Sequence, residues 1–214
     1  MKKIIVEIWS DVMCPFCYIG KRKFEAALAK FDYKDEVSIE WKSFQLDPNI
    51  QTDASKTIHQ FLAERKGFTL EKAKEMNDYM TGLAKNVGLT YNFDRAVVAN
   101  SFDAHRFSHL AKHHNVQDEA EELLFKSYFT DGKNTADADT LIQLGKEIGI
   151  DADEMKEMLS GDKYASDVQE DIIVAESIGV RGVPFFVFNR KYAISGAQES
   201  QVFLDLLNKV HQEG

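Results

Sequence analysis

Hydrophobic and polar positions alternate at the start of the chain. Residues 3–9 read KIIVEIW, an alternating and β-branched run that is typical of a strand. Residues 36–44, EVSIEWKSF, predict a second strand. Between the two strands, a helix is predicted over about residues 15–31, because the apolar positions there follow helical spacing. These positions are Phe24, Ala27, Leu28 and Phe31. Together the three segments predict a βαβ unit.

The rest of the pattern consists of a long helical middle and a mixed end. Residues from about 54 to about 160 are almost entirely helical in pattern. A further helix is predicted over about 163–178, and a last helix from about 199. Between them, strands are predicted near 185–189 and 192–195. The sequence therefore predicts an α/β protein in which strands come from both ends of the chain.

Composition narrows the class of protein. The chain has 214 residues, of which 44% are hydrophobic and 29% charged, and this balance indicates a globular protein. The formal net charge of −9 argues against nucleic acid as a partner, because phosphate backbones bind basic patches. No apolar stretch approaches the roughly 20 residues that span a membrane. The N-terminal apolar run stops at Glu7, too early for a signal peptide, so we expect a cytoplasmic protein.

The only two cysteines, Cys14 and Cys17, are the first candidates for chemistry. A disulfide between them would close a very short loop, and by loop entropy it would stabilise the fold by only about 2 kcal/mol. A reducing cytosol would also keep such a bond open most of the time. The pair is therefore predicted to be a redox centre rather than a structural crosslink, with no resident cofactor and no metal.

The place of this pair at the start of a helix favours redox chemistry. Pro15 fits the first helical position, where its missing N–H costs nothing, so Cys14 lies near the N-cap and Cys17 on the first turn. Side chains three residues apart on a helix are close enough for a disulfide. The positive end of the helix stabilises a thiolate, and such thiols have pKa values lowered to about 3.5–7.5. We predict that Cys14 is the exposed attacking thiol and Cys17 the resolving thiol.

Other interpretations of the cysteines and of three histidines stay open. A C-x-x-C pair can be half of a zinc site, although zinc takes four ligands and no second pair exists. Two cysteines can also be inert members of the core. Three histidines at helical spacing can chelate a metal, but they more often mark a helix with partly buried polar positions. These are His105, His109 and His113.

A second candidate motif lies far along the chain, where residues 180–188 read VRGVPFFVF. Pro184 is one of three prolines, and it opens an apolar run that must be a strand. A proline is tolerated at the first residue of a strand. The sequence alone therefore identifies Pro184 only as a turn residue before a strand.

These motifs resemble the DsbA family of thioredoxin-like oxidoreductases, and more closely its FrnE-like cytoplasmic branch. The supporting segments extend over nearly the whole chain and read WSDVMCPFCYIGKRKFE, WKSFQLDPN, VVANSFDAHRFSHLAK and GVRGVPFFVFNRKYAISGAQ. The resemblance implies a cis peptide bond between Val183 and Pro184 and places both residues beside Cys14. It also implies that the Val183 backbone pairs with an extended substrate segment, as in strand addition.

The same resemblance implies an architecture, namely a thioredoxin-like fold split by a helical insertion. The thioredoxin-like domain is expected to comprise residues 1–50 and 161–214, and the helical insertion residues 51–160. We expect Phe16, between the cysteines, to be exposed, and Phe16 and Pro15 to contact the substrate.

His105 is a further candidate for the active site, because it falls in the segment ANSFDAHR. In the family this segment borders the active-site face, so the resemblance implies a proton or a polar contact near Cys14. Asn100 and Arg106 are weaker candidates for the same role. Three large aromatic residues near the expected face are interpreted as core packing rather than substrate contacts. These are Trp9, Phe44 and Phe185.

The chain departs from the thioredoxin pattern at one position. Many relatives carry a buried acid six residues before the first cysteine, where this chain has Ile8. Glu7 is one residue away, and strand alternation should point it to the opposite face. Asp11 is the remaining nearby carboxylate for the proton of Cys17, unless it only caps the turn.

Three functions stay open on the sequence. The first is a reductase or isomerase of protein disulfides, since a cytosolic glutathione poise near or below about −220 mV disfavours a dedicated oxidant. The second is a glutathione-dependent isomerase or transferase of the kappa or hydroxychromene-carboxylate isomerase type, with glutathione as co-substrate. Those enzymes typically replace the attacking cysteine by serine, whereas this chain keeps both cysteines. The third is a non-catalytic adaptor, and the chain is expected to be a monomer or a homodimer.

The second function gives a possible role to the segment SGAQ, residues 195–198. Ser195 and Gln198 fit a capping box at the start of the last helix. A helix start there would also suit a carboxylate such as those of glutathione.

Overall fold

The structure is a computed structural model that describes residues 3–213. The chain folds into two compact units. The first, here called the sheet unit, contains the residues up to Leu46 and those from Val168 onward. The second, here called the helical unit, is Asp47–Asp167. The sequence places these boundaries after residues 50 and 160, so the structural boundaries differ by four and seven residues.

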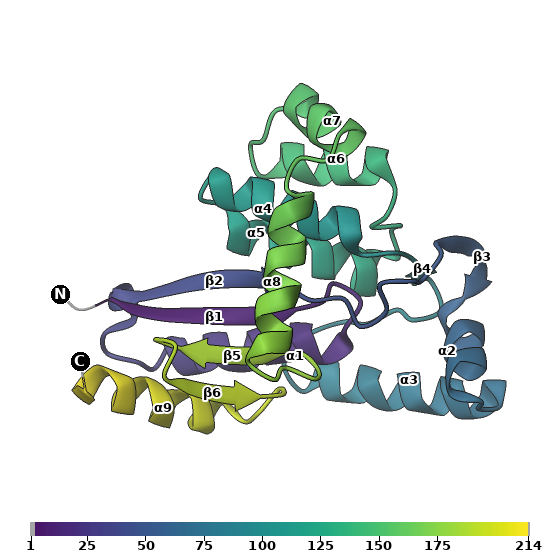
Figure 1. Ribbon diagram of the computed structural model, residues 1–214. Coiled ribbons are helices and arrows are strands. Elements are labelled where there is room, and N and C mark those ends of the chain that lie inside the picture. The colour runs from purple at the N-terminus through teal and green to yellow at the C-terminus, as the bar shows by residue number, and fades with distance from the viewer. Residues whose placement is uncertain (1–2, 214) are drawn as a thin grey trace. The chain divides into compact units, whose positions relative to one another are not determined.

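The sheet unit holds the first and last elements of the chain (Figure 1). Its strands form one four-stranded sheet in the order β2-β1-β5-β6, with β1 parallel to β2 and the other neighbours antiparallel. A short 3₁₀-helix, Lys34–Glu36, precedes β2. The elements are β1 (Ile4–Ser10), α1 (Pro15–Leu28), β2 (Val37–Ser43), α8 (Ala165–Ser177), β5 (Phe185–Phe188), β6 (Tyr192–Ser195) and α9 (Ser200–Glu213).

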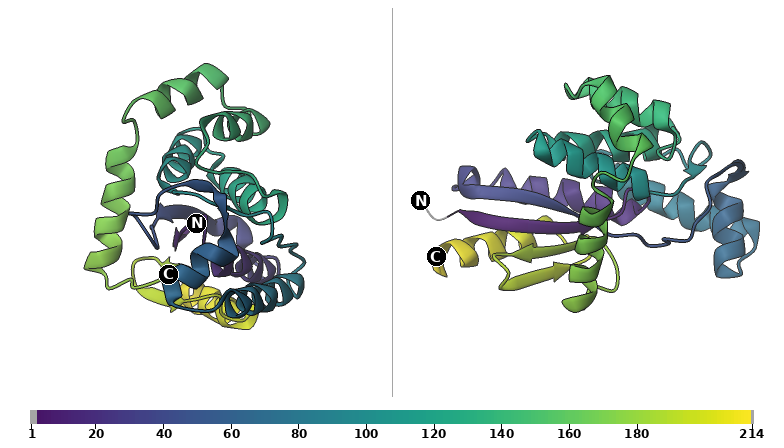
Figure 2. Two further views of the ribbon diagram at one scale, coloured as in Figure 1. Left: turned by 90° about the vertical axis from the view of Figure 1, so that its right-hand side faces the viewer. Right: turned by 45° about the horizontal axis from the view of Figure 1, so that its top comes forward.

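Helices cover both faces of this sheet (Figure 2). On one face, Phe24 of α1 contacts Phe186 of β5 and Phe203 of α9, with ring centroids 5.7 Å apart in both pairs. On the other face, Trp9 of β1 is fully buried against Ala175 of α8. Burying large aromatic side chains on both faces is the main source of stability for such a layered unit.

Asp171 of α8 fastens that helix to the sheet. Its backbone carbonyl accepts a hydrogen bond from Trp9 Nε1 at 2.9 Å, and its carboxylate accepts one from the Ser43 backbone N–H at 3.0 Å. Lys42 Nζ lies 3.1 Å from the same carboxylate. Asp171 is buried, but these partners compensate its negative charge.

A three-residue loop, residues 189–191, joins β5 to β6 and contains a tight turn at Asn189 and Arg190. Both residues have positive φ, 49° and 54°, as the hairpin turn that matches strand twist requires. The Asn189 side chain also accepts a hydrogen bond from the Ile5 backbone N–H at 2.8 Å, which continues the pairing with β1. The strand predicted near 185–189 therefore ends one residue earlier, at Phe188.

The helical unit is mostly helical, as its pattern predicts, but it also contains a small sheet. A two-stranded antiparallel sheet pairs Asp53–Thr57 with Val97–Val98, so the prediction of an almost entirely helical segment is wrong at these two places. The sequence DASKT has no alternation of apolar residues, and only the distant Val97 and Val98 give it a partner. The elements are β3 (Asp53–Thr57), α2 (Ile58–Lys66), α3 (Leu70–Lys85), β4 (Val97–Val98), α4 (Phe102–His113), α5 (Gln117–Phe125), a π-helix at Lys126–Asp131, α6 (Ala138–Glu147) and α7 (Ala152–Ser160).

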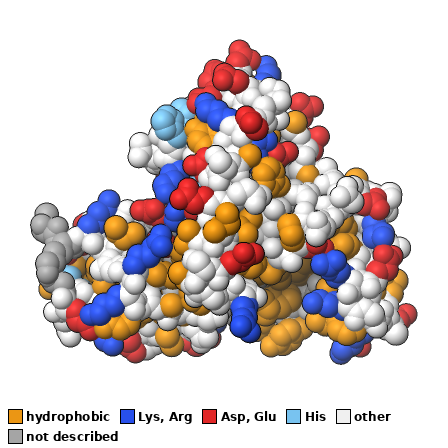
Figure 3. All heavy atoms as spheres, viewed as in Figure 1, with side chains coloured by type: hydrophobic (Ala, Val, Ile, Leu, Met, Phe, Trp, Pro, Cys, Tyr) orange, Lys and Arg blue, Asp and Glu red, His pale blue; other side chains and the backbone are white. Residues whose placement is uncertain are grey.

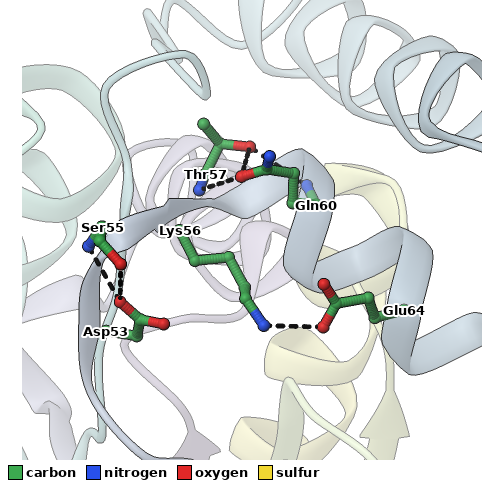
Figure 4. Close-up of polar contacts among 6 residues, drawn as sticks. All are labelled: Asp53, Ser55, Lys56, Thr57, Gln60 and Glu64. Carbon is green, nitrogen blue, oxygen red and sulfur yellow. Dashed lines mark hydrogen bonds and ion pairs between the residues drawn. The ribbon is translucent and has the colours of Figure 1, made fainter.

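Polar side chains stabilise the junction of β3 and α2 (Figure 4). Thr57 is the N-cap of α2, and Thr57 with Gln60 forms a complete capping box. One strand residue and one helix residue also pair across the junction, because Lys56 Nζ lies 2.7 Å from Glu64 Oε2. Within residues 3–213, no helix is both long and apolar enough to cross a membrane.

Candidate active site

The first turn of α1 presents both cysteines. Cys14 is the N-cap residue, with extended backbone angles, and Pro15 occupies the first helical position. The Cys14 backbone N–H donates to the Asp11 carbonyl at 2.9 Å, and the Cys17 backbone N–H donates to the Cys14 carbonyl at 3.0 Å. The structure therefore confirms the predicted placement of Cys14 at the cap and of Cys17 on the first turn.

The Cys14 side chain is not exposed, which corrects the prediction of an exposed attacking thiol. Cys14 is only 3% exposed. Its Sγ donates a hydrogen bond to the Val183 carbonyl oxygen at 3.4 Å. A substrate sulfur must therefore replace this contact, or approach beside it, to meet Cys14.

The segment Val183–Pro184 reaches Cys14 from the far end of the chain. The peptide bond between Val183 and Pro184 is cis, as the family resemblance implied. The Pro184 carbonyl accepts a hydrogen bond from the Gly196 backbone N–H at 2.8 Å, which joins the segment to the residue after β6. The fold thus brings Val183 to Cys14 over 169 positions of sequence.

Cys17 lies one turn further along α1 and is 1% exposed. Burial raises the pKa of the Cys17 thiol well above its ordinary value, and the neighbouring Cys14 thiol raises it further. Two groups oppose this effect and lower the pKa of Cys17, namely the Ser10 hydroxyl and the Asp11 backbone. Cys14 and Cys17 are not joined by a disulfide in the structure. Burial of Cys17 thus favours its protonated thiol over its thiolate.

The nearby acids do not take the place of the missing buried carboxylate. Ile8 points toward the α1 face of the sheet, and Glu7 points to the opposite face, as alternation predicts. Glu7 is buried there and pairs with Arg190. The Asp11 carboxylate accepts hydrogen bonds from the backbone N–H groups of Met13 at 3.3 Å and Leu46 at 2.8 Å. Asp11 therefore holds the turn before α1, which is the second of its two predicted roles.

In this site a strand leads into a helix that starts at a C-x-x-C pair, and a distant proline segment lies beside that pair. A comparison with protein families points to the same arrangement. Residues 5–208 match the model of the DSBA-like thioredoxin domain. The chain belongs to this family. A crystal structure of a probable DsbA oxidoreductase from Streptomyces coelicolor is 35% identical and covers 99% of this chain and 91% of its own, with a TM-score of 0.92. The fold of this DSBA-like chain is therefore α/β and thioredoxin-like, with a helical insertion between strands.

Two more distant structures share the fold of this DSBA-like chain but differ from each other in their described activities. One is the cytosolic disulfide reductase DsbM from Pseudomonas aeruginosa, which covers 98% of this chain and 100% of its own. The other is a 2-hydroxychromene-2-carboxylate isomerase, which covers 98% and 97%. Each has a TM-score of 0.70 at 14% identity. The fold alone therefore does not choose between these activities.

The aromatic residues around the cysteines of this DSBA-like chain are either exposed or part of the core, as the sequence suggests. Phe16 is 43% exposed, which confirms the expectation of exposure between the cysteines. Trp9 is fully buried, and Phe44 and Phe185 pack against the cluster that contains it. These three residues therefore belong to the core of the sheet unit.

His105 lies in the helical unit of this family member, on α4, and is 2% exposed. Its predicted contact with Cys14 stays a prediction. The weaker candidates have structural partners within the helical unit. The Asn100 amide donates to the Pro48 and Ile50 carbonyls, and the Arg106 guanidinium donates to three carbonyls at and beyond the end of α7. Among residues 3–213, no group of three or more histidine, cysteine or acidic side chains is arranged to hold a metal ion.

Three features of the site differ from the sequence interpretation or were missed by it. Ser195 is the last residue of β6, and Gln198 Nε2 donates to its backbone carbonyl at 2.9 Å, so the predicted capping box is wrong. Helix α9 begins only at Ser200. Gly20 was missed because its importance lies in a contact with Pro184, a residue that no local pattern connects to it. Ser10 was missed as well, although its even-numbered position puts it on the same face as Ile8.

Proposed function

We propose that this chain is a thiol–disulfide oxidoreductase that reduces or rearranges disulfides in proteins and peptides. One observation carries the proposal, which is that Cys14 caps α1 with its Sγ 3.4 Å from the Val183 carbonyl while Cys17 lies behind it on the first turn. Family membership supports the same class of chemistry. The more detailed assignment to the FrnE-like branch rests on the sequence segments alone.

The two thiols have different roles in the proposed reaction. Cys14 attacks a substrate disulfide, which forms a mixed disulfide and releases one substrate thiolate. Cys17 then attacks Cys14 Sγ, so that the Cys14–Cys17 bond forms and the second substrate sulfur leaves. The substrate disulfide is reduced by two electrons, and the protein dithiol is oxidised. The helix start favours Cys14 as the attacking thiol, because the unpaired N–H groups there stabilise negative charge.

The segment before β5 is the proposed substrate-binding element. The Val183 backbone pairs with an extended substrate strand, and Pro184 fixes the approach of that strand to Cys14. Pro15 and the exposed Phe16 contact the substrate beside the disulfide. An apolar ring that is 43% exposed suits a polypeptide substrate, which offers apolar side chains for contact.

The proposed partners are protein or peptide thiols and disulfides rather than nucleic acids or membranes. On the face of the molecule drawn in Figure 3, acidic and basic side chains are interspersed rather than gathered by sign. A net charge of −9 adds to this, because phosphate backbones bind to basic surfaces. We place the protein in the cytoplasm, where the glutathione poise favours reduction or rearrangement over net disulfide formation. Its proposed state is a monomer or a homodimer.

A glutathione-dependent isomerase or transferase is the second candidate, and a non-catalytic adaptor is the third. The structural likeness to a 2-hydroxychromene-2-carboxylate isomerase is what favours the second candidate. Against it, this chain has a cysteine at the attacking position and a second cysteine beside it. An adaptor would have no use for a buried dithiol placed against a distant proline segment.

The test is thiol-driven reduction of insulin together with refolding of a protein with scrambled disulfides. Wild type should be active in both assays, and Cys14→Ser should be inactive in both. Cys17→Ser should lose insulin reduction and accumulate mixed disulfides. If wild type is no more active than Cys14→Ser in both assays, the proposed function is wrong. Turnover of glutathione conjugates by wild type would instead support the second candidate.

A further inference from the structure

Cys17 has to lose a proton in a place that disfavours its thiolate. The side chain is 1% exposed, and burial raises the pKa of this thiol. Resolution of a mixed disulfide requires the Cys17 thiolate, because the thiol is not the nucleophile. The site therefore needs a group that favours charge on Cys17 Sγ at the moment of attack.

The carboxylates nearest in sequence are not available for this work. Glu7 points to the other face of the sheet and pairs with Arg190. Both Asp11 carboxylate oxygens accept backbone hydrogen bonds, from Met13 and from Leu46. Lys21, one turn beyond Cys17 on α1, pairs with Glu25. The charged groups of β1 and of the α1 helix around Cys17 thus have partners of their own.

Ser10 is the polar side chain that remains beside Cys17. It is the last residue of β1, and by alternation its side chain shares the α1 face with Val6 and Ile8. The residue is 2% exposed, and its hydroxyl has no hydrogen-bond partner of ordinary geometry within the described part of the chain. The hydroxyl nevertheless lies close enough to Cys17 to lower the pKa of that thiol.

A buried hydroxyl without a partner is costly, and it becomes satisfied only when an acceptor appears. A thiol is a weak acceptor, whereas a thiolate is a charged one and forms the stronger, charge-assisted hydrogen bond. The Ser10 hydroxyl, which lacks an acceptor within residues 3–213, therefore stabilises the Cys17 thiolate more than the Cys17 thiol. Such a donor, fixed in a dry site where charge will develop, stabilises the reacting state more than the resting state.

We propose that the Ser10 hydroxyl donates a hydrogen bond to Cys17 Sγ as the Cys17 thiolate forms, and so assists the resolving step in place of a buried acid. In this step the Cys17 proton passes to solvent, and the Cys17 thiolate attacks Cys14 Sγ. The Cys14–Cys17 bond forms, and the bond from Cys14 to the substrate sulfur breaks. The leaving thiolate takes up a proton from solvent when its pKa requires it. The inference deepens the proposed function and rests on it.

The experiment uses dithiobis(nitrobenzoate), an aromatic disulfide whose thiolate product is coloured. It is mixed with the reduced full-length protein. Attack by Cys14 releases the first aromatic thiolate, and resolution by Cys17 releases the second. The two phases are followed by stopped flow from about pH 6 to about pH 10, a range that covers ordinary thiol titration. In the mixed disulfide Cys14 has no thiol, so the second phase reports the ionisation of Cys17 alone.

For Ser10→Ala we expect an unchanged first phase and a slower second phase. Loss of this donor raises the pKa of Cys17, and a fall of about tenfold in its thiolate fraction below that pKa sets the scale of the expected effect. The more basic thiolate is about threefold more nucleophilic, given a Brønsted coefficient of about 0.4–0.5. The second phase should therefore be about threefold slower, with its pH profile moved upward. Ser10→Thr keeps the hydroxyl on a residue that suits a strand, and it should restore the second phase.

The outcomes separate this inference from the proposed function. If the second phase of Ser10→Ala is as fast as that of wild type at every pH, Ser10 does not have the proposed role. A Ser10→Thr variant as slow as Ser10→Ala overturns it as well, because a hydroxyl would then make no difference. Cys17→Ser is the matched control and should release one thiolate only. A wild-type protein that releases only one thiolate contradicts the proposed function itself, whatever Ser10 does.

Discussion

Gly20 and Pro184 approach each other so closely that a side chain on Gly20 has no room. A Cβ added to Gly20 would lie 2.9 Å from Pro184 Cγ, closer than real Cβ atoms come to a neighbour. Gly20 lies on α1 one turn beyond Cys17, and Pro184 precedes β5. The absence of a side chain at Gly20 therefore lets the proline segment reach the helix that carries both cysteines.

Gly20→Ala should destabilise the protein and slow disulfide reduction. Alanine favours a helix over glycine by roughly 1 kcal/mol, but overpacking a buried contact costs about 1–3 kcal/mol. The Pro184 ring is rigid, so relief of the clash moves the segment that holds Val183 against Cys14. We expect a loss of about 1–2 kcal/mol in the free energy of unfolding by denaturant. The rate of insulin reduction should fall several-fold.

Gly82→Ala is the matched control, because Gly82 lies in the interior of α3 and an added Cβ there meets nothing within 4 Å. It should stabilise the protein by up to about 1 kcal/mol and leave insulin reduction unchanged. If Gly20→Ala behaves like Gly82→Ala, the contact with Pro184 does not constrain the site.

Alkaline pH should weaken the reduced protein through Cys17. Because burial raises the pKa of Cys17 in the folded state, the folded protein holds this proton more tightly than the unfolded chain. The resulting stability is complete below the ordinary thiol pKa of about 8.5 and declines as pH rises above it. The comparison is made in a Cys14→Ser background, with and without Cys17→Ala. The difference in unfolding free energy between the two proteins should shrink above about pH 8.5, and a constant difference would contradict the raised pKa.

Arg190 should stabilise the fold by compensating the buried Glu7 carboxylate. The guanidinium pairs with Glu7 and lies over the Trp9 ring, with its Cζ 5.9 Å from the centroid. Arg190→Asn removes the charge and tolerates the left-handed backbone at this position. We expect a loss of about 1–3 kcal/mol in unfolding free energy, since an uncompensated charge is left in the core. Adding Glu7→Gln should recover part of this loss.

A control for the hairpin is Lys191→Asn, next to Arg190, where the partner Glu213 is on the surface. Exposed ion pairs contribute little, so this variant should be close to wild type in a denaturant melt. Equal effects of Arg190→Asn and Lys191→Asn would show that burial of Glu7 does not matter.

Arg106 should be needed for the helical unit rather than for catalysis. Its guanidinium donates to the carbonyls of Met158, Gly161 and Lys163, which lie at and beyond the end of α7. Arg106→Ala leaves these acceptors without that donor, and we expect a loss of at least about 2 kcal/mol in unfolding free energy. Arg106→Lys should be only partly tolerated, because a lysine cannot reproduce the planar set of donors.

Lys156→Ala on α7 is the comparison for Arg106, because its ion pair with Asp153 is on the surface. It should leave the melting temperature unchanged. At a temperature where all variants are folded, insulin reduction per folded molecule should be the same for Arg106→Ala and wild type. A selective loss of turnover without loss of stability would return Arg106 to the list of active-site candidates.

The sequence determined the local features of the site. The alternation of residues 3–9 and the position of Pro15 were enough to place Cys14 at a helix cap and Cys17 on its first turn, because strand alternation and helix starts depend on near neighbours. Alternation also placed Glu7 and Ile8 on opposite faces. The same local reasoning failed at β3, whose pairing with Val97 and Val98 is long-range and leaves no periodic pattern.

Tertiary structure decided what surrounds the two cysteines. The contact of Cys14 with the Val183 carbonyl joins residues 169 positions apart, and the thiol predicted to be exposed is buried. The lack of room beside Gly20 and the hydroxyl of Ser10 without a partner are likewise properties of packed neighbours. A sequence specifies which groups are present and how each short segment folds. Reactivity at Cys14 and Cys17 depends on burial and on donors and acceptors within a few ångströms, and only folding brings these together.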